Sequence, residues 1–444
     1  MSGTATAPGP PPASTGTAAG LPRLLPAAYQ DLTAHLRTHG PLPHRGAALI
    51  EEIRRAGLTG RGGAGFPTAV KMAAVAGGRG RPVVVGNGAE GEPASDKDKQ
   101  LLAWAPHLVL DGLRLAAEAV GARRACLYVP AGGRPWPTLA SALAERAAAG
   151  WDRITPELVD APPRFLAGEE SALASRVGGG LARPTFKRRG VYERGVGGAP
   201  TLVQNVETLA HIALIARFGA AWFRAVGTAG EPGSLLVTVH RADGVSLVSE
   251  VPSGARAGAV LELDRAPAQA VLTGGYHGAW LPADRVAGLP LTAAALRGAG
   301  GMLGAGVLAA LPADRCGLAE TARVLGYLAA ESAGQCGPCL NGLPRIAAAF
   351  AHLAGPSPDR RCLADLERWS GLVAGRGACH HPDGTVRLVR SALTVFAAEI
   401  DRHVRGRCAA QPGPGGSGPA PFLPLPAQAP GGSGPGGLSR EDWR

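Results

Sequence analysis

Short apolar runs alternate with helical runs between residues 82 and 159, and this alternation constrains the fold more than any other feature of the sequence. Strands that alternate with helices indicate an α/β layer structure. We therefore predict an α/β domain over residues 21–225. The expected strands are 82–85, 125–129 and 154–159, and the expected helices are 101–120 and 138–149.

The rest of the chain changes in composition three times. Two β-rich runs with a turn at Asp243-Gly244 between them predict a small β domain over 226–290. Residues 291–408 are predicted to be helical. The ends are rich in Pro, Gly, Ala and Ser and lack apolar periodicity, so we expect residues 1–20 and 409–444 to be disordered tails.

Composition excludes some classes of protein. The chain has 444 residues, 45% of them hydrophobic, so it can bury a core and form more than one domain. No secretory signal and no uninterrupted apolar span is visible, which predicts a cytoplasmic protein. The net charge of +11 would suit nucleic acid, but the Arg residues are scattered and Lys187-Arg188-Arg189 is the one run. We expect no nucleic acid partner and no membrane insertion.

A glycine-rich loop precedes the first predicted strand. Residues 57–71 read GLTGRGGAGFPTAVK, and the glycines let the backbone adopt positive φ and approach a ligand closely. Thr68 can begin a helix whose amides face an anion, while Arg61 and Lys71 can neutralise phosphate. The pattern favours a loop that binds a phosphate or nucleotide. A flexible surface loop is the alternative.

This loop closely resembles the flavin loop of the NADH-binding flavoprotein subunit of respiratory complex I, the NuoF family, and of related diaphorase and RnfC-type subunits. Further motifs that resemble the same family follow in the expected order, over roughly residues 45–405. They are Asn87–Pro93 with Lys97-Asp98, Gly168–Leu173, Pro200–Thr208, and Cys336-Gly-Pro-Cys339 with Cys379.

The resemblance implies a Rossmann-like FMN/NADH-binding domain over 21–225, a β-grasp domain of the SLBB type over 226–290 and a helical iron–sulfur domain over 291–408. It implies NADH stacked on the flavin, with Phe66 and Phe186 near adenine and Glu92 near the ribose. No side-chain acid or base is required for hydride transfer between two flat rings, so we expect no catalytic side chain. The implied FMN-binding residues are Gly60, Arg61, Gly62, Gly63, Lys71, Asn87, Glu90, Gly168, Glu169, Glu170 and Asn205. For Glu169 and Glu170 a solvated helix start is the alternative.

The chain departs from the family pattern at four positions around the expected cofactor. Gly88-Ala89 stands where the complex I subunit has a carboxylate, as in the RnfC type. Phe165 replaces a tyrosine, Gln204 replaces the first Asn of a pair, and Ala74 replaces an aromatic residue expected at the adenine. Nucleotide affinity or selectivity is expected to differ accordingly.

The seven cysteines indicate metal ligation rather than disulfides, because their number is odd and the chain is expected in the cytosol. The resemblance implies that Cys336, Cys339 and Cys379 bind a [4Fe-4S] cluster, with Ala333 in place of the first ligand. A cluster with a fourth ligand from elsewhere, a three-thiolate cluster and an empty site all remain open, with zinc as a minor alternative. The candidate fourth ligands are Cys316, Cys362, His380 and His381. We expect Cys126 to lie in the core and Cys408 to be incidental.

The resulting prediction is an FMN-dependent NADH dehydrogenase of the diaphorase type. Electrons would leave through the iron–sulfur cluster to a ferredoxin-like protein or a membrane reductase subunit, so the protein would lie in the cytoplasm or at the periphery of a membrane complex. Reverse flow, from ferredoxin to NAD, is an alternative. A scaffold that kept the fold without the cofactor is another.

Overall fold

Four parallel strands form the central sheet of the first part of the chain. The computed structural model describes residues 23–186, 189–408, 410, 421–426 and 441–443. The strand order is β3-β2-β1-β4, which confirms the predicted α/β fold. The strands are β1 (Val83–Asn87), β2 (Arg124–Val129), β3 (Glu157–Asp160) and β4 (Thr201–Asn205). Cys126 is fully buried in β2, as predicted.

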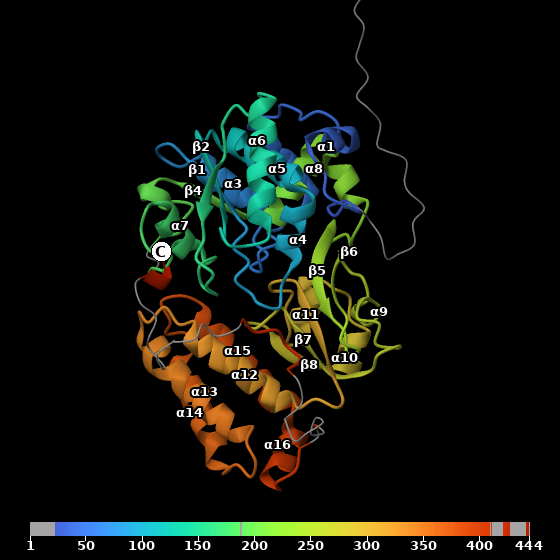
Figure 1. Cartoon of the computed structure of the whole chain (residues 1–444), viewed down its shortest axis with the longest axis vertical. Helices are drawn as coiled ribbons and strands as arrows, with labels where there is room; N and C mark the ends of the chain where they lie inside the picture. Colours follow the sequence, from blue (N-terminus) through green and yellow to red (C-terminus); the bar gives the residue numbers. More distant parts are fainter. Residues whose placement is uncertain (1–22, 187–188, 409, 411–420, 427–440, 444) are drawn as a thin grey trace, which may run out of the picture.

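Helices cover this sheet and supply most of its core (Figure 1). The predicted helix 101–120 is two helices, because Pro106 lacks an amide hydrogen and begins a new helix at its first position. The second of these, α5 (Pro106–Val120), packs closely on α8 (Val206–Arg224). A Cβ at Gly112 of α5 would lie 1.9 Å from the Leu209 carbonyl oxygen. The helices are α1 (Leu32–His39), α2 (Ala48–Ala56), α3 (Thr68–Ala76), α4 (Lys97–Trp104), α5 (Pro106–Val120), α6 (Pro135–Ala148), α7 (Glu170–Val177) and α8 (Val206–Arg224).

Helix α8 is long and apolar enough to pass a composition test for a membrane span. It is mostly buried, however, and it packs against α5 and α2 within the core. Its apolar residues are therefore accounted for by packing inside the protein.

A second sheet of five strands follows, in the order β6-β5-β9-β7-β8. Its strands are β5 (Ser234–His240), β6 (Ser246–Pro252), β7 (Ala268–Thr273), β8 (Ala279–Pro282) and β9 (Val307–Pro312). Strand β9 is central and pairs with β5 and β7, although it lies beyond the range 226–290 that the sequence indicated for this domain. Short helices α9 (Ala257–Val260), α10 (Ala283–Ala287) and α11 (Ala293–Gly298) lie between the strands.

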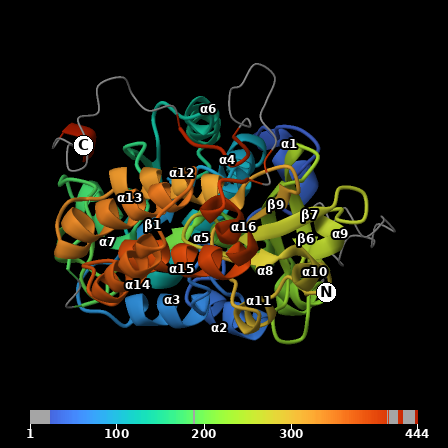
Figure 2. The ribbon, with the colours of Figure 1, turned by 90° about the horizontal axis from the view of Figure 1, so that it is seen from below.

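The C-terminal part is helical from residue 317 onward, whereas the predicted helical range 291–408 also contains strand β9; it occupies one end of the molecule (Figures 1 and 2). Its core is continuous with one face of the second sheet, since Leu272, Trp280 and Leu311 belong to the same apolar cluster as Leu325 and Phe350. The helices are α12 (Gly317–Ala330), α13 (Leu343–Leu353), α14 (Arg361–Val373), α15 (His381–Val395) and α16 (Ala397–Val404), with a π-helical turn at Pro338–Gly342.

Two short stretches of the predicted C-terminal tail, residues 421–426 and 441–443, pack on the rest of the protein. Leu423 is 1% exposed and its backbone amide donates to Glu320, while the Tyr276 hydroxyl donates to the Pro424 carbonyl. Trp443 is fully buried in a small cluster with Leu166 and Ala333. Isolated apolar residues thus anchor parts of a Pro- and Gly-rich segment, which composition alone does not reveal. The predicted tail at 1–20 lies outside the described residues.

Candidate functional site

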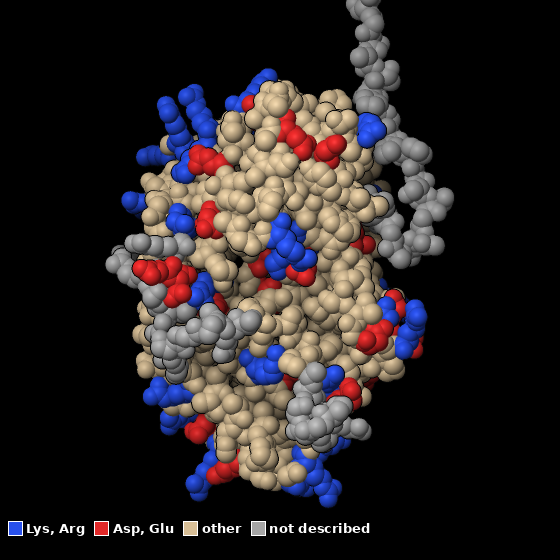
Figure 3. Space-filling view, viewed as in Figure 1, with Lys and Arg blue, Asp and Glu red and all other residues tan. Residues whose placement is uncertain are grey.

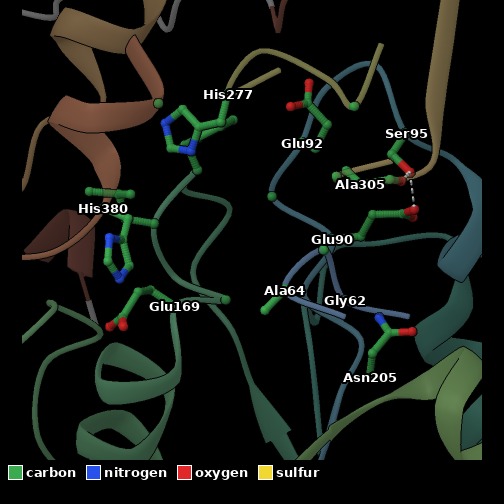
Figure 4. Close-up of a pocket in the computed structure, with 18 of the residues that line it drawn as sticks. Gly62, Ala64, Glu90, Glu92, Ser95, Glu169, Asn205, His277, Ala305 and His380 are labelled. Atoms are coloured by element: carbon green, nitrogen blue, oxygen red, sulfur yellow. Dashed lines mark hydrogen bonds between the residues drawn. The ribbon is translucent and has the colours of Figure 1, made fainter. Parts of the chain in front are cut away.

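A cavity of ≈ 540 Å³ opens where all three parts of the chain meet. The order of the first sheet reverses between β1 and β4, and ligands of open α/β sheets bind at such a switch point, beyond the carboxyl ends of the strands. Asn87 and Asn205 end these two strands, are paired in register and both line the cavity. Figure 4 shows Asn205, Glu90 and Ser95 on one side, His277, His380 and Glu169 on the other, and Gly62 and Ala64 between them.

The glycine-rich loop forms one wall of the cavity through Arg61–Ala64. Gly63 has φ 106°, and a Cβ there would lie 3.3 Å from the Gly304 carbonyl oxygen. A Cβ on Gly62 would lie 3.3 Å from the Asn205 side chain. The loop closes on itself through the Gly60 amide, which donates to the Phe66 carbonyl at 2.9 Å. These glycines leave the wall open to a ligand.

The two cations predicted to neutralise phosphate are both engaged elsewhere. The Arg61 guanidinium donates to the carbonyls of Pro232 and Ser234, and burial lowers its pKa. Lys71 is paired with Glu170 and donates to the Val203 carbonyl at 3.0 Å. In the described conformation both side chains are paired within the protein, and their role at a phosphate stays a prediction.

Glu90 supports the opposite wall rather than pointing into it. Its carboxylate accepts hydrogen bonds from the Ser95 hydroxyl at 2.6 Å and from the amides of Asp98 and Lys99, at the start of α4. It is one of the non-glycine residues with positive φ, at 38°. Burial raises its pKa, and Asp98 adds to that effect. Such strain at a cavity wall is typical of functional sites.

A buried charge network lies beside Asn205. Lys97 is 2.8 Å from Glu207 and 2.7 Å from Asp98, and the Asn205 amide donates to Asp98 at 2.6 Å. Asn205 also caps α8 by accepting from the Glu207 amide at 3.0 Å. Lys97 lies between two carboxylates, so the polar groups of this wall are fixed by their own ion pairs and hydrogen bonds.

Glu92 links the cavity to the second sheet. Its carboxylate accepts from the Tyr276 amide at 2.8 Å and from the Ala94 amide at 3.2 Å. A Cβ at Gly275 would lie 2.5 Å from this carboxylate, and Gly275 has φ 87°, so both space and backbone favour glycine there. Burial raises the pKa of Glu92 to about 7.

The start of α7 lies on the cavity wall as well. Glu169 is the N-cap of α7 and accepts from the amides of Ser171 and Ala172 at 2.9 and 3.2 Å. The Asn87 amide donates to the Gly168 carbonyl at 2.8 Å, which ties this helix start to the end of β1. Glu169 therefore has a capping role as well as a place on the cavity wall.

The third wall comes from the helical part and from loops of the second sheet, which the sequence did not assign to the flavin site. His277 Nε2 is 2.9 Å from His381 Nδ1, and His381 Nε2 is 2.8 Å from the Leu328 carbonyl. Burial lowers the pKa of both imidazoles, that of His381 to about 4. Arg387 donates to the His277 carbonyl at 2.6 Å and lies at the exposed rim. The glycine-rich loops at 274–278 and 300–306 were the available signal in the sequence.

Cys379 lies on this third wall, so the predicted cluster site adjoins the cavity. Burial raises the pKa of Cys339 to about 12, and the nearby Cys336 and Cys379 add to that rise. Ala333, in place of the first ligand, is 8% exposed and packs with Leu166 and Trp443. The three predicted thiols therefore come together around the turn at 333–339.

Three of the four candidates for the fourth ligand of the cluster make other contacts in the structure. Cys316 lies 3.4 Å from His403 Nε2, in a separate group. Cys362 lines a different cavity, of ≈ 550 Å³, with Asp359. His381 has both ring nitrogens engaged by His277 and Leu328.

The two predicted adenine-binding aromatics lie outside the central cavity. In the described part of the chain, Phe66 and Phe186 are 52% and 74% exposed. Phe186 lines another cavity, of ≈ 710 Å³, together with Thr185, Arg189 and Arg194. Of the predicted cofactor residues, those that the structure brings to the central cavity are Arg61, Gly62, Gly63, Asn87, Glu90, Glu92, Gly168, Glu169 and Asn205. Those described elsewhere are Gly60, Phe66, Lys71, Glu170 and Phe186.

Two family models match the chain, one on each side of this cavity. The Nuo51 FMN-binding domain matches residues 53–214. The NADH-ubiquinone oxidoreductase-F iron-sulfur binding region matches residues 319–403, which include all three predicted thiols.

Curated relatives match over most of both chains. The F subunit of the NADH-quinone oxidoreductase of Mycobacterium bovis is 30% identical over 390 residues, which are 81% of this chain and 85% of the relative. The corresponding F 2 subunit of Rhizobium meliloti is 28% identical over 379 residues, 81% of this chain and 89% of the relative. The HndC subunit of the NADP-reducing hydrogenase of Solidesulfovibrio fructosivorans is 28% identical, with 81% and 76% covered.

A solved structure shares the architecture. The crystal structure of an NAD⁺-reducing [NiFe]-hydrogenase in the H₂-reduced state matches with a TM-score of 0.75 and 28% identity. The match covers 87% of this chain and 68% of the hydrogenase chain.

Proposed function

Because this chain belongs to the family of the NADH-quinone oxidoreductase F subunits, we propose that FMN occupies the cavity at the β1/β4 switch point and that NADH enters from its rim. The chain is an FMN-dependent NADH dehydrogenase that transfers electrons through an iron–sulfur centre. When bound, FMN accepts a hydride from NADH and releases electrons singly. The residues described above hold, orient and enclose the two nucleotides.

The cavity fits a flavin on three counts. Its volume of ≈ 540 Å³ is within the range of roughly 300–1,000 Å³ that is common for cofactor pockets. Gly62 and Gly63 leave part of one wall without side chains, so a flat ring system can lie against the backbone there. Asn87, Asn205 and Glu90 line the opposite side and are held by their own hydrogen bonds, which fixes the polar contacts in advance.

For the nucleotide, we propose that adenine stacks on the exposed rings of Phe66 and Phe186 and that its ribose meets Glu92. Both rings are open to solvent, as a stacking surface must be before the ligand binds. Carboxylates at the ribose would repel the additional phosphate of NADPH, so we propose a preference for NADH. Arg387 is the candidate cation for the diphosphate, because its side chain is exposed at the rim, whereas Arg61 is largely buried and Lys71 is paired with Glu170.

For the cluster, we propose that Cys336, Cys339 and Cys379 bind it as thiolates. These three thiols are distinct from another group of potential metal ligands, at Cys316, whose ligand atoms all lie within 4.8 Å of one another. Cys379 also lines the cavity, which gives electrons a short route out of the flavin. His380, on the same wall, is the remaining candidate for the fourth ligand.

Relatives in this family are subunits of NADH-quinone oxidoreductase or hydrogenase assemblies, so the chain is expected to work with partner subunits. We propose a ferredoxin-like protein or a membrane reductase subunit as the electron acceptor. The proposed location is the cytoplasm, at the periphery of a membrane complex. On the face seen in Figure 3, Lys and Arg are interspersed with Asp and Glu, and this arrangement does not favour a nucleic acid partner.

The single observation that carries the proposal is the cavity at the switch point with its glycine wall. Gly63→Ala places a methyl group against Gly304 at a strained φ, so we expect it to weaken FMN binding by about tenfold or more. The measurement is the quenching of flavin fluorescence when FMN is titrated into protein stripped of flavin. Gly132→Ala is the matched control, because Gly132 has open space around it and lies outside the cavity wall. Equal FMN affinity for both variants would contradict the assignment of this wall.

A further inference from the structure

Four potential metal ligands gather at the far end of the helical part, away from the flavin cavity. They are Cys316, Glu399, His403 and Cys408, and their ligand atoms all lie within 4.8 Å of one another. His403 Nε2 is 3.4 Å from Cys316 Sγ and 3.3 Å from Glu399 Oε1. Cys316, Glu399 and His403 are 3%, 6% and 5% exposed, and Cys408 is exposed.

Each ligand is positioned by regular structure. Cys316 is the N-cap of α12, where its sulfur accepts from the Ala319 amide at 3.4 Å. Glu399 and His403 are four residues apart on α16 and therefore share one face of that helix. Gly406 follows the C-cap of α16 with φ 70°, and its amide donates to the His403 carbonyl. This glycine cap turns the chain so that Cys408 comes back to Cys316.

Outer contacts orient the ligands as they do in metal sites. His403 Nδ1 lies 3.1 Å from the Gly355 carbonyl, an arrangement in which Nδ1 donates its proton and Nε2 keeps its lone pair for a metal. The other Glu399 oxygen accepts from Arg402 at 2.9 Å, so Oε1 is left facing the group. An imidazole fixed by a carbonyl and a carboxylate fixed by an arginine are the usual outer contacts of metal ligands.

We propose that Cys316, Glu399, His403 and Cys408 bind one structural zinc ion. Zinc prefers a tetrahedron of thiolate, imidazole and carboxylate ligands, with bond lengths that place neighbouring S and N, or N and O, ligand atoms roughly 3.4–3.6 Å apart. The observed separations of 3.4 and 3.3 Å agree with that geometry. Four protein ligands complete the coordination, so the ion has no open position for a substrate. On binding, the two thiols release their protons and no redox change takes place.

The zinc group and the iron–sulfur thiols lie at opposite ends of one helix. Cys316 precedes α12, whereas Cys336 and Cys339 follow it, and the 14 residues of α12 span about 20 Å. Cys316 therefore lies too far from Cys336 and Cys339 to serve as the fourth ligand of the cluster. Instead, a metal at Cys316 joins the start of α12 to the end of α16 and to the residue before the tail. The role that the arrangement supports is to hold the C-terminal end of the helical part in place.

The test is the metal content of the full-length chain, purified without oxygen, together with X-ray absorption at the zinc edge, which does not report iron. We expect about one zinc per chain, bound by two sulfurs at about 2.3 Å and two N/O atoms at about 2.0–2.2 Å. Cys408→Ser and His403→Gln should each lose most of this zinc while they keep iron and flavin. Cys408 is exposed, so its replacement by serine leaves the buried core unchanged.

Two control variants distinguish zinc at this site from zinc bound by the other thiols of the helical part. Cys362→Ser changes a buried thiol that belongs to neither group, and it should retain the zinc. Cys336→Ser should lose iron and retain zinc. Iron-replete protein without zinc, zinc bound by three or four sulfurs, or zinc that disappears with Cys336 rather than with Cys408 would each overturn the proposal. An intact mass that shows a Cys316–Cys408 disulfide would also overturn it.

Discussion

The two ends of α12 carry two groups of thiols that differ in their distance from the flavin cavity. At the C-terminal end, Cys336 and Cys339 lie with Cys379, which lines the cavity. At the N-terminal end, Cys316 lies with His403 and Cys408 in a compact group with four potential ligands. We propose that the thiols beside the cavity serve electron transfer and that those at the other end of the helix serve stability, so position in the fold would decide what the same residue types do.

The largest effect is expected from paired substitutions at the two ends. Cys339→Ser removes a cluster ligand, so reduction of an external acceptor by NADH should fall by more than about tenfold. NADH should still reduce the bound flavin in that variant, because the hydride step precedes the cluster. Cys408→Ser should leave acceptor reduction unchanged. The rates of flavin reduction and of acceptor reduction are measured by stopped-flow absorbance. An equal loss of acceptor reduction in both variants would show that the two groups of thiols do not differ in function.

An added thiolate ligand at the proposed cluster site tests the same comparison in the opposite direction. Ala333 occupies the position of the first family ligand and is 8% exposed, beside Leu166 and Trp443. Ala333→Cys supplies a fourth thiolate, so the cluster should be retained several times longer in air. The measurement is iron content against time of exposure. Ala329→Cys, on the last turn of α12 outside the turn that carries the ligands, is the matched control. Cluster loss at the wild-type rate in Ala333→Cys would show that this position is not adjacent to the cluster.

Removal of zinc should affect stability rather than electron transfer. If free zinc exceeds its dissociation constant a hundredfold, the ion adds about 3 kcal/mol to the free energy of unfolding. A chelator should therefore lower the unfolding midpoint of the wild type but not that of Cys408→Ser. The readout is far-ultraviolet circular dichroism during urea unfolding. A chelator that lowered both midpoints equally would be acting elsewhere in the molecule.

The smallest effect concerns Glu92, which joins the cavity to the second sheet. Burial raises its pKa from 4.5 to about 7, so between these values the folded state binds more protons than the unfolded state. The free energy of unfolding therefore falls as pH rises through this window, by about 2 kcal/mol between pH 5 and pH 7. Glu92→Gln should flatten that dependence. An unchanged slope in urea unfolding at several pH values would contradict the shift.

The sequence predicted the elements whose signals are local. The strands at 83–87 and 124–129 are short apolar runs, and the loop at 60–65 and the CxxC spacing are contiguous motifs. The proposed zinc group could not be predicted from the sequence, in which Cys408 was expected to be incidental, because its four residues are spread over 93 positions and meet through the packing of α12 on α16. The one local trace is Glu399-x-x-x-His403 on a single helix.

Contacts between distant parts of the chain could not be predicted from the sequence either. The glycine-rich loop around Arg61 is a local motif, but the sequence could not show that the Arg61 guanidinium donates to carbonyls of residues more than 170 positions away. His277 and Arg387 reach the cavity from the second sheet and from α15, and only the tertiary fold brings them there. Composition likewise cannot show that Trp443 finds an apolar site beside Leu166.

The central claim is that NADH reduces a flavin held in the cavity at the β1/β4 switch point and that the electrons then reach the cluster beside it. The most direct measurement is the visible spectrum of the anaerobically purified chain before and after addition of NADH, with flavin and iron determined on the same sample. The account predicts flavin bands that bleach within the mixing time, together with loss of the broad iron–sulfur absorbance. A chain that binds no FMN even after reconstitution, or FMN that NADH does not reduce, would contradict it.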